Sequence, residues 1–227
     1  MTFDQFTTLL NSIAGLVGAV AWPLVAVFAL LLFAKPISDF VASINEFSLN
    51  GGGIGLSAKR KTEAAAALGA AIAKQPDLQE PEAIAQQLRK ASQIVDAVSP
   101  QTAKEANKAT VLWVDDVPSN NTNERRALEA LGVTFVLATS TEEALRKINK
   151  ESFKAIISDL GRPEGRTAGF TLLEKLRVSE NQTPFIIYAG SAAVAFRDEA
   201  MNKGAFGCTN RPDQLFDLVL SAIRSSR

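Results

Sequence analysis

The stretch VLWVDDVP at residues 111–118 decides how this chain is interpreted. Four apolar residues run directly into two acidic ones, a pattern typical of a strand buried on both faces. Four more short apolar runs follow: TFVLA from Thr134, AIIS at residues 155–158, PFIIYA from Pro184 and FGCT at residues 206–209. Helical stretches alternate with them at residues 121–131, 141–149 (with Thr141 as N-cap), 169–178, 193–203 and 212–224. This alternation predicts an α/β domain over residues 109–227, with a parallel sheet covered on both faces.

Acidic residues end two of these strands. Asp115 and Asp116 follow the first strand, and Asp159 follows the third. In the flavodoxin-like strand order 2-1-3-4-5, the first and third strands are neighbours, so these carboxylates converge in one crevice. Because like charges repel, we expect a hard divalent cation with oxygen ligands, Mg²⁺, to bind there. Such a cation would also screen an incoming phosphoryl group, so that one carboxylate could act as a nucleophile.

Three motifs carry a family resemblance. In order and spacing, VLWVDDVP, IISDLGRPEG and GAFGCTNRP resemble the receiver (CheY-like) domain of two-component response regulators, over about half of the chain. The resemblance implies that Asp159 accepts a phosphoryl group. It also implies that Asp116, Asp159 and the backbone carbonyl of Gly161 bind Mg²⁺, while Asp115 acts mostly through a water. The expected partner is a sensor histidine kinase or another phosphodonor protein, in a phosphorelay without enzymatic turnover.

The chain departs from the receiver pattern on the other side of this crevice. Ala189 stands where receivers carry a hydroxyl, although Ser191 is close enough in sequence to substitute. Arg211 stands in place of the usual lysine and keeps its charge but not its geometry. Cys208 replaces the switch aromatic, and the loop after the acceptor carries Arg162. The acceptor site is complete, but the residues that would respond to the phosphoryl group, at positions 189, 208 and 211, are altered. A pseudo-receiver with a merely inherited acidic cluster therefore stays open.

The N-terminal part has a different character. Residues 13–34, IAGLVGAVAWPLVAVFALLLFA, lack charge and are long enough for a transmembrane helix after a short extracytoplasmic segment, residues 1–12. Lys35 and the basic residues 59–61 follow it, so the positive-inside rule places the rest in the cytoplasm. We therefore expect a single-pass protein of the bacterial inner membrane with its N-terminus outside. A buried soluble helix or a cleaved signal peptide fits less well, because the start is acidic and the apolar run is long.

Two segments join the membrane helix to the α/β domain. Residues 35–57 predict an amphipathic helix and a β-hairpin, and residues 58–108 predict a helical linker or stalk. Within the latter, Ala58 to Lys74 and Pro81 to Val98 each predict a helix, and residues 99–108 predict a polar linker. A seam about two heptads long fits either two helices packed on each other or an oligomerisation stalk, so a homo-oligomer stays open. The seam consists of Ile84, Leu88, Ala91, Val95 and Val98.

Composition excludes several classes of function. The 24 basic and 24 acidic residues balance, which argues against a nucleic-acid-binding protein. The chain has no histidine, so Ser-His-Asp and Cys-His catalytic units, His metal ligands and a phospho-accepting His are all excluded. Its single cysteine, Cys208, fits a reducing compartment and a buried core position.

Two classes of function remain in competition. The first is a membrane-anchored signalling protein that is phosphorylated on an aspartate and acts through protein–protein interaction. The second is a degenerate receiver that senses a ligand or partner and clusters the transmembrane helix, such as a membrane-perturbing defence effector. An enzyme of similar topology, a phosphatase or an NADase, is disfavoured, because the first strand is followed by neither Asp-x-Asp nor Gly-x-Gly-x-x-Gly.

Overall fold

The structure is a computed structural model that describes residues 58–75, 81–190 and 195–226. The expected transmembrane helix at residues 13–34 and its flanking segments, 1–12 and 35–57, lie outside these residues. Within the described ranges, no helix combines the length and the apolar character needed to cross a membrane. Residues Ile54–Arg227 form one compact unit, so the helices before residue 109 and the α/β domain belong together.

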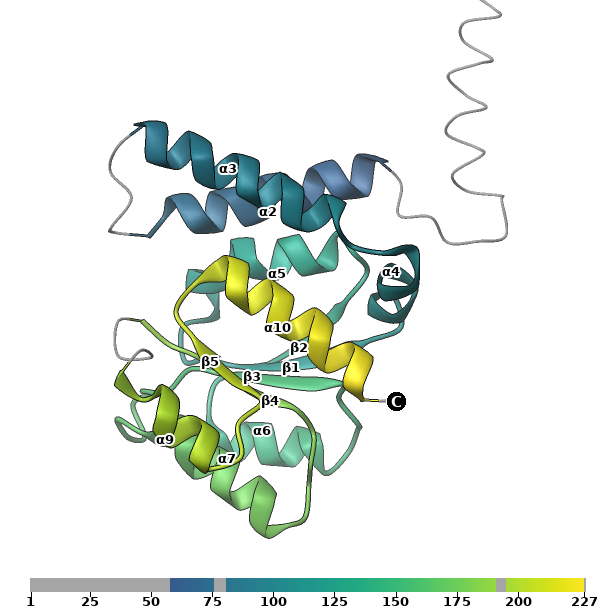
Figure 1. Cartoon of the computed structure of the whole chain (residues 1–227). Coiled ribbons are helices and arrows are strands. Elements are labelled where there is room, and N and C mark those ends of the chain that lie inside the picture. The colour runs from purple at the N-terminus through teal and green to yellow at the C-terminus, as the bar shows by residue number, and fades with distance from the viewer. Residues whose placement is uncertain (1–57, 76–80, 191–194, 227) are drawn as a thin grey trace, which may run out of the picture. The chain divides into compact units, whose positions relative to one another are not determined.

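The centre of this unit is a parallel sheet in the spatial order β2-β1-β3-β4-β5 (Figure 1). The strands are β1 (Thr110–Val114), β2 (Thr134–Ala138), β3 (Ala155–Ser158), β4 (Phe185–Tyr188) and β5 (Gly207–Thr209). The predicted flavodoxin-like α/β fold with five parallel strands is confirmed. Because Val114 of β1 pairs with Ser158 of β3, the acidic residues that follow both strands leave the sheet at the same edge.

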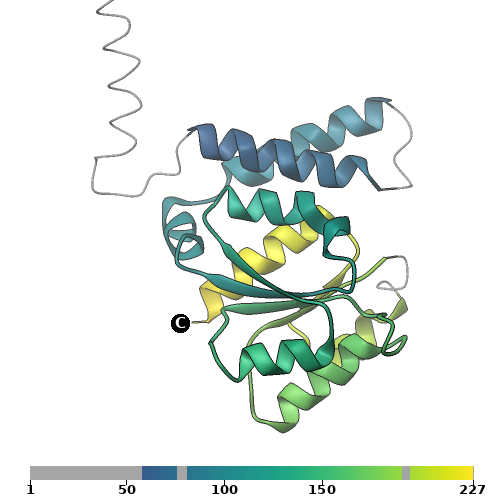
Figure 2. The same ribbon diagram turned by 180° about the vertical axis from the view of Figure 1, so that it is seen from behind.

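Helices cover both faces of the sheet (Figures 1 and 2). One face carries α6 (Thr141–Ile148), α7 (Ala168–Val178) and α9 (Arg197–Asn202). The other carries α5 (Thr122–Glu129), which follows the short 3₁₀ helix η1 (Pro118–Asn121), and α10 (Pro212–Ser225). Strand β1 contributes to both cores, with Trp113 on the α5–α10 side and Leu112 on the α6–α7 side. This division follows from the alternation of side chains along a strand.

A further layer of two helices lies over α5. Helices α2 (Ala58–Ala73) and α3 (Pro81–Asp96) pack against each other, and α2 packs against α5 (Figure 1). Leu68 of α2 and Val95 of α3 are fully buried and share one hydrophobic core with Trp113 of β1. In the predicted seam, Leu88 is 44% exposed. The α2–α3 hairpin is therefore continuous with the receiver-like core.

The segment between the hairpin and the sheet differs from its prediction. Residues 99–108 were expected to form a polar linker, but they contain the helix α4 (Pro100–Ala106). Its N-cap is Ser99, and its residues Ala103 and Ala106 are buried in the same core as the hairpin. A helix forms here because proline at its start and the serine cap favour initiation, while the alanines give it an apolar side.

The structure describes the start of α6 and part of the helix that was predicted from residue 193. The N-cap of α6 is Ser140 and not Thr141, since Ser140 Oγ accepts a hydrogen bond from the backbone N–H of Glu143 at 3.2 Å. The hydroxyl of Thr141 is engaged instead with the loop that follows β3. The helix predicted from residue 193 is described from Arg197 as α9, and the start of its predicted range lies outside the described residues.

Candidate functional site

The predicted acidic residues line one cavity at the carboxyl edge of the sheet. Its volume is about 240 Å³. Asp115 and Asp116 reach it from the end of β1, Asp159 from the end of β3, and Ala189 from the end of β4. The remaining lining residues are Asn120, Asn121, Tyr188, Gly190 and Asn210. The sequence therefore placed the three carboxylates correctly in one crevice.

Asp115 is held firmly by its neighbours. Its side chain is buried, and one oxygen, Oδ1, accepts a hydrogen bond from the backbone N–H of Val117 at 2.7 Å. The other oxygen, Oδ2, accepts from Nδ2 of Asn121 at 2.5 Å. Because each oxygen already has a donor, Asp115 is suited to an indirect role in ion binding.

Asp159 occupies the least favourable electrostatic position. Burial and the nearby charges of Asp115 and Asp116 raise the pKa of its carboxyl from 3.8 to about 6. A hydrogen bond from the backbone N–H of Leu160 to Oδ1, at 2.7 Å, and the cation of Arg162 partly oppose this rise in pKa. The negative charge of Asp159 is therefore partly buried, and the nearby donors do not fully offset the cost of that burial. Such a carboxylate is suited to bind a cation or to react.

Arg162 fixes the loop that follows β3. Its side chain is fully buried, and Nη1 donates hydrogen bonds to Ser158 Oγ at 2.7 Å and to the backbone carbonyl of Asp159 at 2.8 Å. Its Nη2 donates to Thr141 Oγ1 at 2.7 Å, and its Nε pairs with Glu164 at 3.0 Å. One guanidinium thus joins the end of β3, its loop and the start of α6.

The side chains of the cavity fit a hard divalent cation such as Mg²⁺. Asp116 and Asp159 offer carboxylate oxygens, which Mg²⁺ prefers. Within the described part of the chain, no three His, Cys, Asp or Glu side chains are arranged to hold a metal ion directly. A cation here would therefore draw its other ligands from main-chain carbonyls, such as that of Gly161, and from water. It would also relieve the repulsion that raises the pKa of Asp159.

On the opposite side of the cavity, the described residues bring neither the cation of Arg211 nor a hydroxyl at position 189 to the wall. Arg211 does not line the cavity, because its guanidinium pairs with Asp213 and leaves Asn210 at the wall. Ala189 lines the cavity with a methyl group. Ser191, the proposed substitute donor, lies outside the described residues.

Two further residues near this wall were not singled out from the sequence. Tyr188 lines the cavity, and its hydroxyl donates a hydrogen bond to Oε1 of Glu124 on α5 at 3.1 Å. Burial raises the pKa of Glu124, although that hydrogen bond and the charge of Lys74, the residue that follows α2, oppose the rise. A glutamate on the buried face of α5 was the only signal that the sequence offered for this pair.

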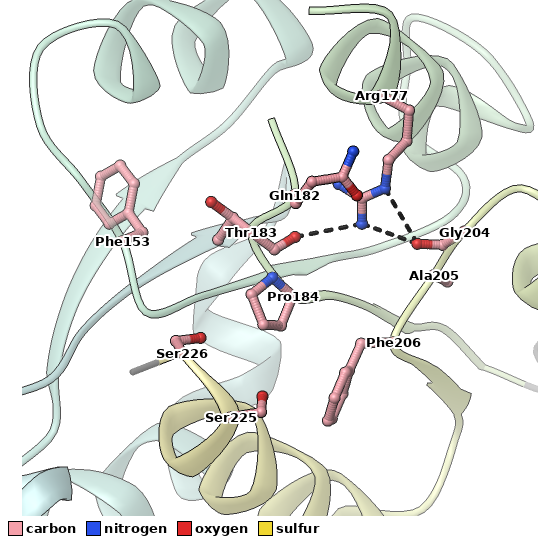
Figure 3. Close-up of a pocket in the computed structure, with 10 residues that line it drawn as sticks. All are labelled: Phe153, Arg177, Gln182, Thr183, Pro184, Gly204, Ala205, Phe206, Ser225 and Ser226. Atoms are coloured by element: carbon pink, nitrogen blue, oxygen red, sulfur yellow. Dashed lines mark hydrogen bonds between the residues drawn. The ribbon is translucent and has the colours of Figure 1, made fainter. Parts of the chain in front are cut away.

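A larger cavity, of about 540 Å³, lies at the opposite edge of the sheet (Figure 3). It is lined by residues that precede β3, β4 and β5, among them Phe153, Pro184 and Phe206. The guanidinium of Arg177 donates hydrogen bonds to the backbone carbonyls of Thr183 and Gly204 in this cavity (Figure 3). Arg177 thus joins the loops that precede β4 and β5.

Comparison with known proteins agrees with this geometry. The family model of the response regulator receiver domain matches residues 111–222. The chain is 29% identical over 118 residues to the sensor protein EvgS of Escherichia coli O157:H7 and 28% identical to that of strain K12. Each of these alignments covers 52% of this chain and 10% of the relative, so the chain spans about a tenth of the length of these relatives.

Solved structures of receivers are also similar to this chain. The receiver domain of the Francisella response regulator 1452 is 23% identical with a TM-score of 0.46, covering 52% of this chain and 99% of that one. The chemotaxis response regulator CheY4 of Vibrio cholerae is 25% identical with a TM-score of 0.41, covering 52% and 98%. The match to the family model supports a response regulator receiver domain of two-component signalling at residues 111–222 of this chain.

Proposed function

We propose that this chain is a membrane-anchored signalling protein whose receiver domain is phosphorylated on Asp159 in an Mg²⁺-dependent phosphorelay. The observation that carries the proposal is the position of Asp159. Its carboxyl lines the acidic cavity beside Asp115 and Asp116, and burial and their charges raise its pKa to about 6. A carboxylate in this setting gains more than an exposed one from a bound cation.

The reaction is a phosphoryl transfer to a carboxylate. An oxygen of Asp159 forms a bond to the phosphorus of the donor, while the bond from phosphorus to the donor breaks and the donor keeps the electron pair. Leu160 N–H and Arg162 hold the end of β3, so that Asp159 faces the cavity. A bound Mg²⁺, held by Asp116, Asp159 and the carbonyl of Gly161, would neutralise charge on the transferred group.

Signalling then depends on a partner protein. A hollow of about 460 Å³ lies between α9, β5 and α10, lined by Met201, Cys208 and Leu218 among others. Met201 is 48% exposed, and methionine adapts readily to a protein partner. This face is the proposed output surface, through which the phosphorylated domain acts by protein–protein interaction.

The remaining parts of the proposal rest on sequence. Residues 13–34 supply a span that is long and apolar enough to anchor the chain in the bacterial inner membrane, with the receiver domain in the cytoplasm. The phosphodonor is a sensor histidine kinase or another phosphodonor protein, because this chain has no histidine. The similarity of the receiver segment to a protein named as a sensor supports this kind of donor.

The altered wall of the cavity favours a second candidate. Arg211 is bound to Asp213, and Ala189 offers no hydroxyl. A degenerate receiver that senses a ligand or partner and clusters the transmembrane helix, such as a membrane-perturbing defence effector, would need neither group. Such a protein would gain no phosphoryl group, and forced clustering of the full chain would be toxic to cells.

The test uses the full chain in a mild detergent, incubated with Mg²⁺ and acetyl phosphate and followed by intact mass. We expect a labile gain of one phosphoryl group in the wild type and in Asp198→Asn, an exposed control on α9. Asp159→Asn should gain none. A folded wild-type protein that gains no phosphoryl group would overturn the proposal and leave the second candidate.

A further inference from the structure

We propose that Lys90 of α3 and Asp213 of α10 are positioning residues for Arg211, so that the α2–α3 hairpin controls whether Arg211 reaches a phosphoryl group on Asp159. This inference rests on the proposed function. The three residues form a continuous chain of ion pairs, Lys90–Asp213–Arg211. It joins the hairpin to the β5–α10 loop, which forms one wall of the acidic cavity.

Arg211 is held away from the cavity by its own neighbour. Its Nε donates to Oδ1 of Asp213 at 3.1 Å, and its Nη2 donates to Oδ2 at 3.2 Å. The side chain of Arg211 is 34% exposed, and the adjacent residue Asn210 lines the cavity. Arg211 therefore lies one residue from the cavity wall, but its cation is committed to another carboxylate.

Asp213 binds a second cation from a distant part of the chain. Nζ of Lys90 lies 2.7 Å from Oδ2 of Asp213, across 123 residues of sequence. The side chain of Asp213 is only 4% exposed. Burial alone would raise its pKa, but the hydrogen bonds from Arg211 and Lys90 leave the pKa of Asp213 below its ordinary value. The carboxylate thus stays ionised and is shared between two cations.

The segment that directly follows the other helix of the hairpin contacts the same loop. Nε2 of Gln75, two residues after the end of α2, donates a hydrogen bond to the backbone carbonyl of Asn210 at 3.1 Å. The hairpin therefore binds residues on both sides of Arg211, through Lys90 of α3 and through Gln75. A change in the packing of the hairpin would therefore shift this loop, and a shift of the loop would alter the packing of the hairpin.

The shared carboxylate determines how easily Arg211 can leave. A buried carboxylate without a partner is strongly destabilising. While Lys90 remains bound, Arg211 can turn toward a phosphoryl group without leaving Asp213 unpaired. Without Lys90, Arg211 becomes the remaining ion-pair partner of Asp213 and is held back. By linkage, phosphorylation that draws Arg211 away must strengthen the hold of Asp213 on Lys90.

The experiment compares four full-length proteins, phosphorylated with acetyl phosphate and Mg²⁺ and followed by intact mass. Lys90→Met should slow phosphoryl gain and shorten the lifetime of the phosphoryl group roughly fivefold, the net worth of one ordinary hydrogen bond. Lys90→Arg keeps the cation and should behave as the wild type. Arg89→Met removes an exposed cation from the neighbouring position and should change nothing.

Two further readouts separate positioning from a merely structural role. In an Arg211→Met background, Lys90→Met should have no additional effect on the phosphoryl lifetime, because the residue through which Lys90 acts is gone. Phosphorylation of the wild type should slow amide hydrogen exchange in α3, residues 81–96, and this slowing should disappear in Lys90→Met.

The outcomes distinguish this inference from the function on which it rests. If the wild type gains no phosphoryl group, the proposed function fails and the inference fails with it. If the wild type is phosphorylated and Lys90→Met has the wild-type rate and lifetime, the inference alone is overturned. Additive effects of Lys90→Met and Arg211→Met would overturn it as well, because two independent sites would then be at work.

Discussion

The two sides of the acidic cavity differ in the side chains that they present to it. On the side of β1 and β3, Asp115 and Asp159 each accept hydrogen bonds from nearby donors, and Arg162 holds the loop behind them. On the side of β4 and β5, Ala189 offers only a methyl group, and Arg211 is committed to Asp213. Under the proposed function, the first side, the acceptor side, receives the phosphoryl group, whereas the second side, the readout side, depends on the hairpin under the proposed role of Lys90. Together the proposals predict that acceptance and response are separable, and the following experiments probe each side.

The largest effect is expected on the acceptor side, at Arg162. Arg162→Met removes a buried cation that bridges β3, its loop and α6, so the free energy of unfolding should fall by about 2–3 kcal/mol. Urea denaturation measures this loss. Arg166→Met, which alters an exposed arginine of the same loop, should leave stability within about 0.5 kcal/mol of the wild type. Equal stability of the two variants would refute the bridging role of Arg162.

The next largest effect concerns the charge of Asp159. Its folded pKa of about 6 lies above the ordinary 3.8, so ionisation costs stability at neutral pH and costs nothing below about pH 4. Without Mg²⁺, Asp159→Asn should raise the free energy of unfolding at pH 7 by about 1–2 kcal/mol, with allowance for solvent screening. The gain should fade as pH falls from 6 to 4. A gain that is the same at pH 4 and pH 7 would contradict this origin.

A smaller effect of the same sign is expected at Glu124, which contacts Tyr188 of β4 on the readout side. Its carboxyl is buried, Oε2 has no hydrogen-bond partner among the described residues, and burial raises its pKa above 4.5. Glu124→Gln should therefore stabilise the protein by about 1 kcal/mol at pH 7. Because the folded pKa is the higher one, this gain should disappear toward pH 4.5. Glu129→Gln, at an exposed position of the same helix, is the control in urea denaturation, and an equal gain there would remove the role of burial.

The smallest effect is expected from restoring a donor on the readout side. Ala189→Ser places a hydroxyl at the cavity wall and should raise the rate of phosphoryl gain about threefold, as one additional hydrogen bond would. Initial rates with acetyl phosphate and Mg²⁺ measure this change. No increase would mean that position 189 does not face the transferred group.

The sequence was sufficient for the sheet and for the acceptor side, because both depend on local patterns. Short apolar runs that end in Asp115–Asp116 and in Asp159 predict buried strands with acidic ends, and β1 and β3 are neighbours as expected. Choices between chemically similar neighbours were less secure. Ser140 and Thr141 can both cap a helix, and the contacts of Thr141 with Arg162 and Glu164 decide between them.

The readout side could not be predicted, because it depends on contacts between distant residues. The pair Lys90–Asp213 spans 123 residues, and the alanine-rich helix α2 shows no pattern that identifies α5 as its neighbour. Arg162 was recognised only as a charge in a loop, whereas its side chain is fully buried. Nothing in a single sequence distinguishes a solvated arginine from a buried one whose partners lie on three elements.

The core that the hairpin shares with the sheet limits how this protein can be divided. A fragment that begins at residue 104 would lack α2 and α3, whose apolar side chains share one buried core with those of α5 and α10, Leu128 and Phe216 among them, and it would expose part of that core. Contiguous exposed apolar surface promotes self-association. An aggregate of such a fragment would reveal nothing about the natural oligomeric state, and we expect a soluble fragment to begin at or before Ala58.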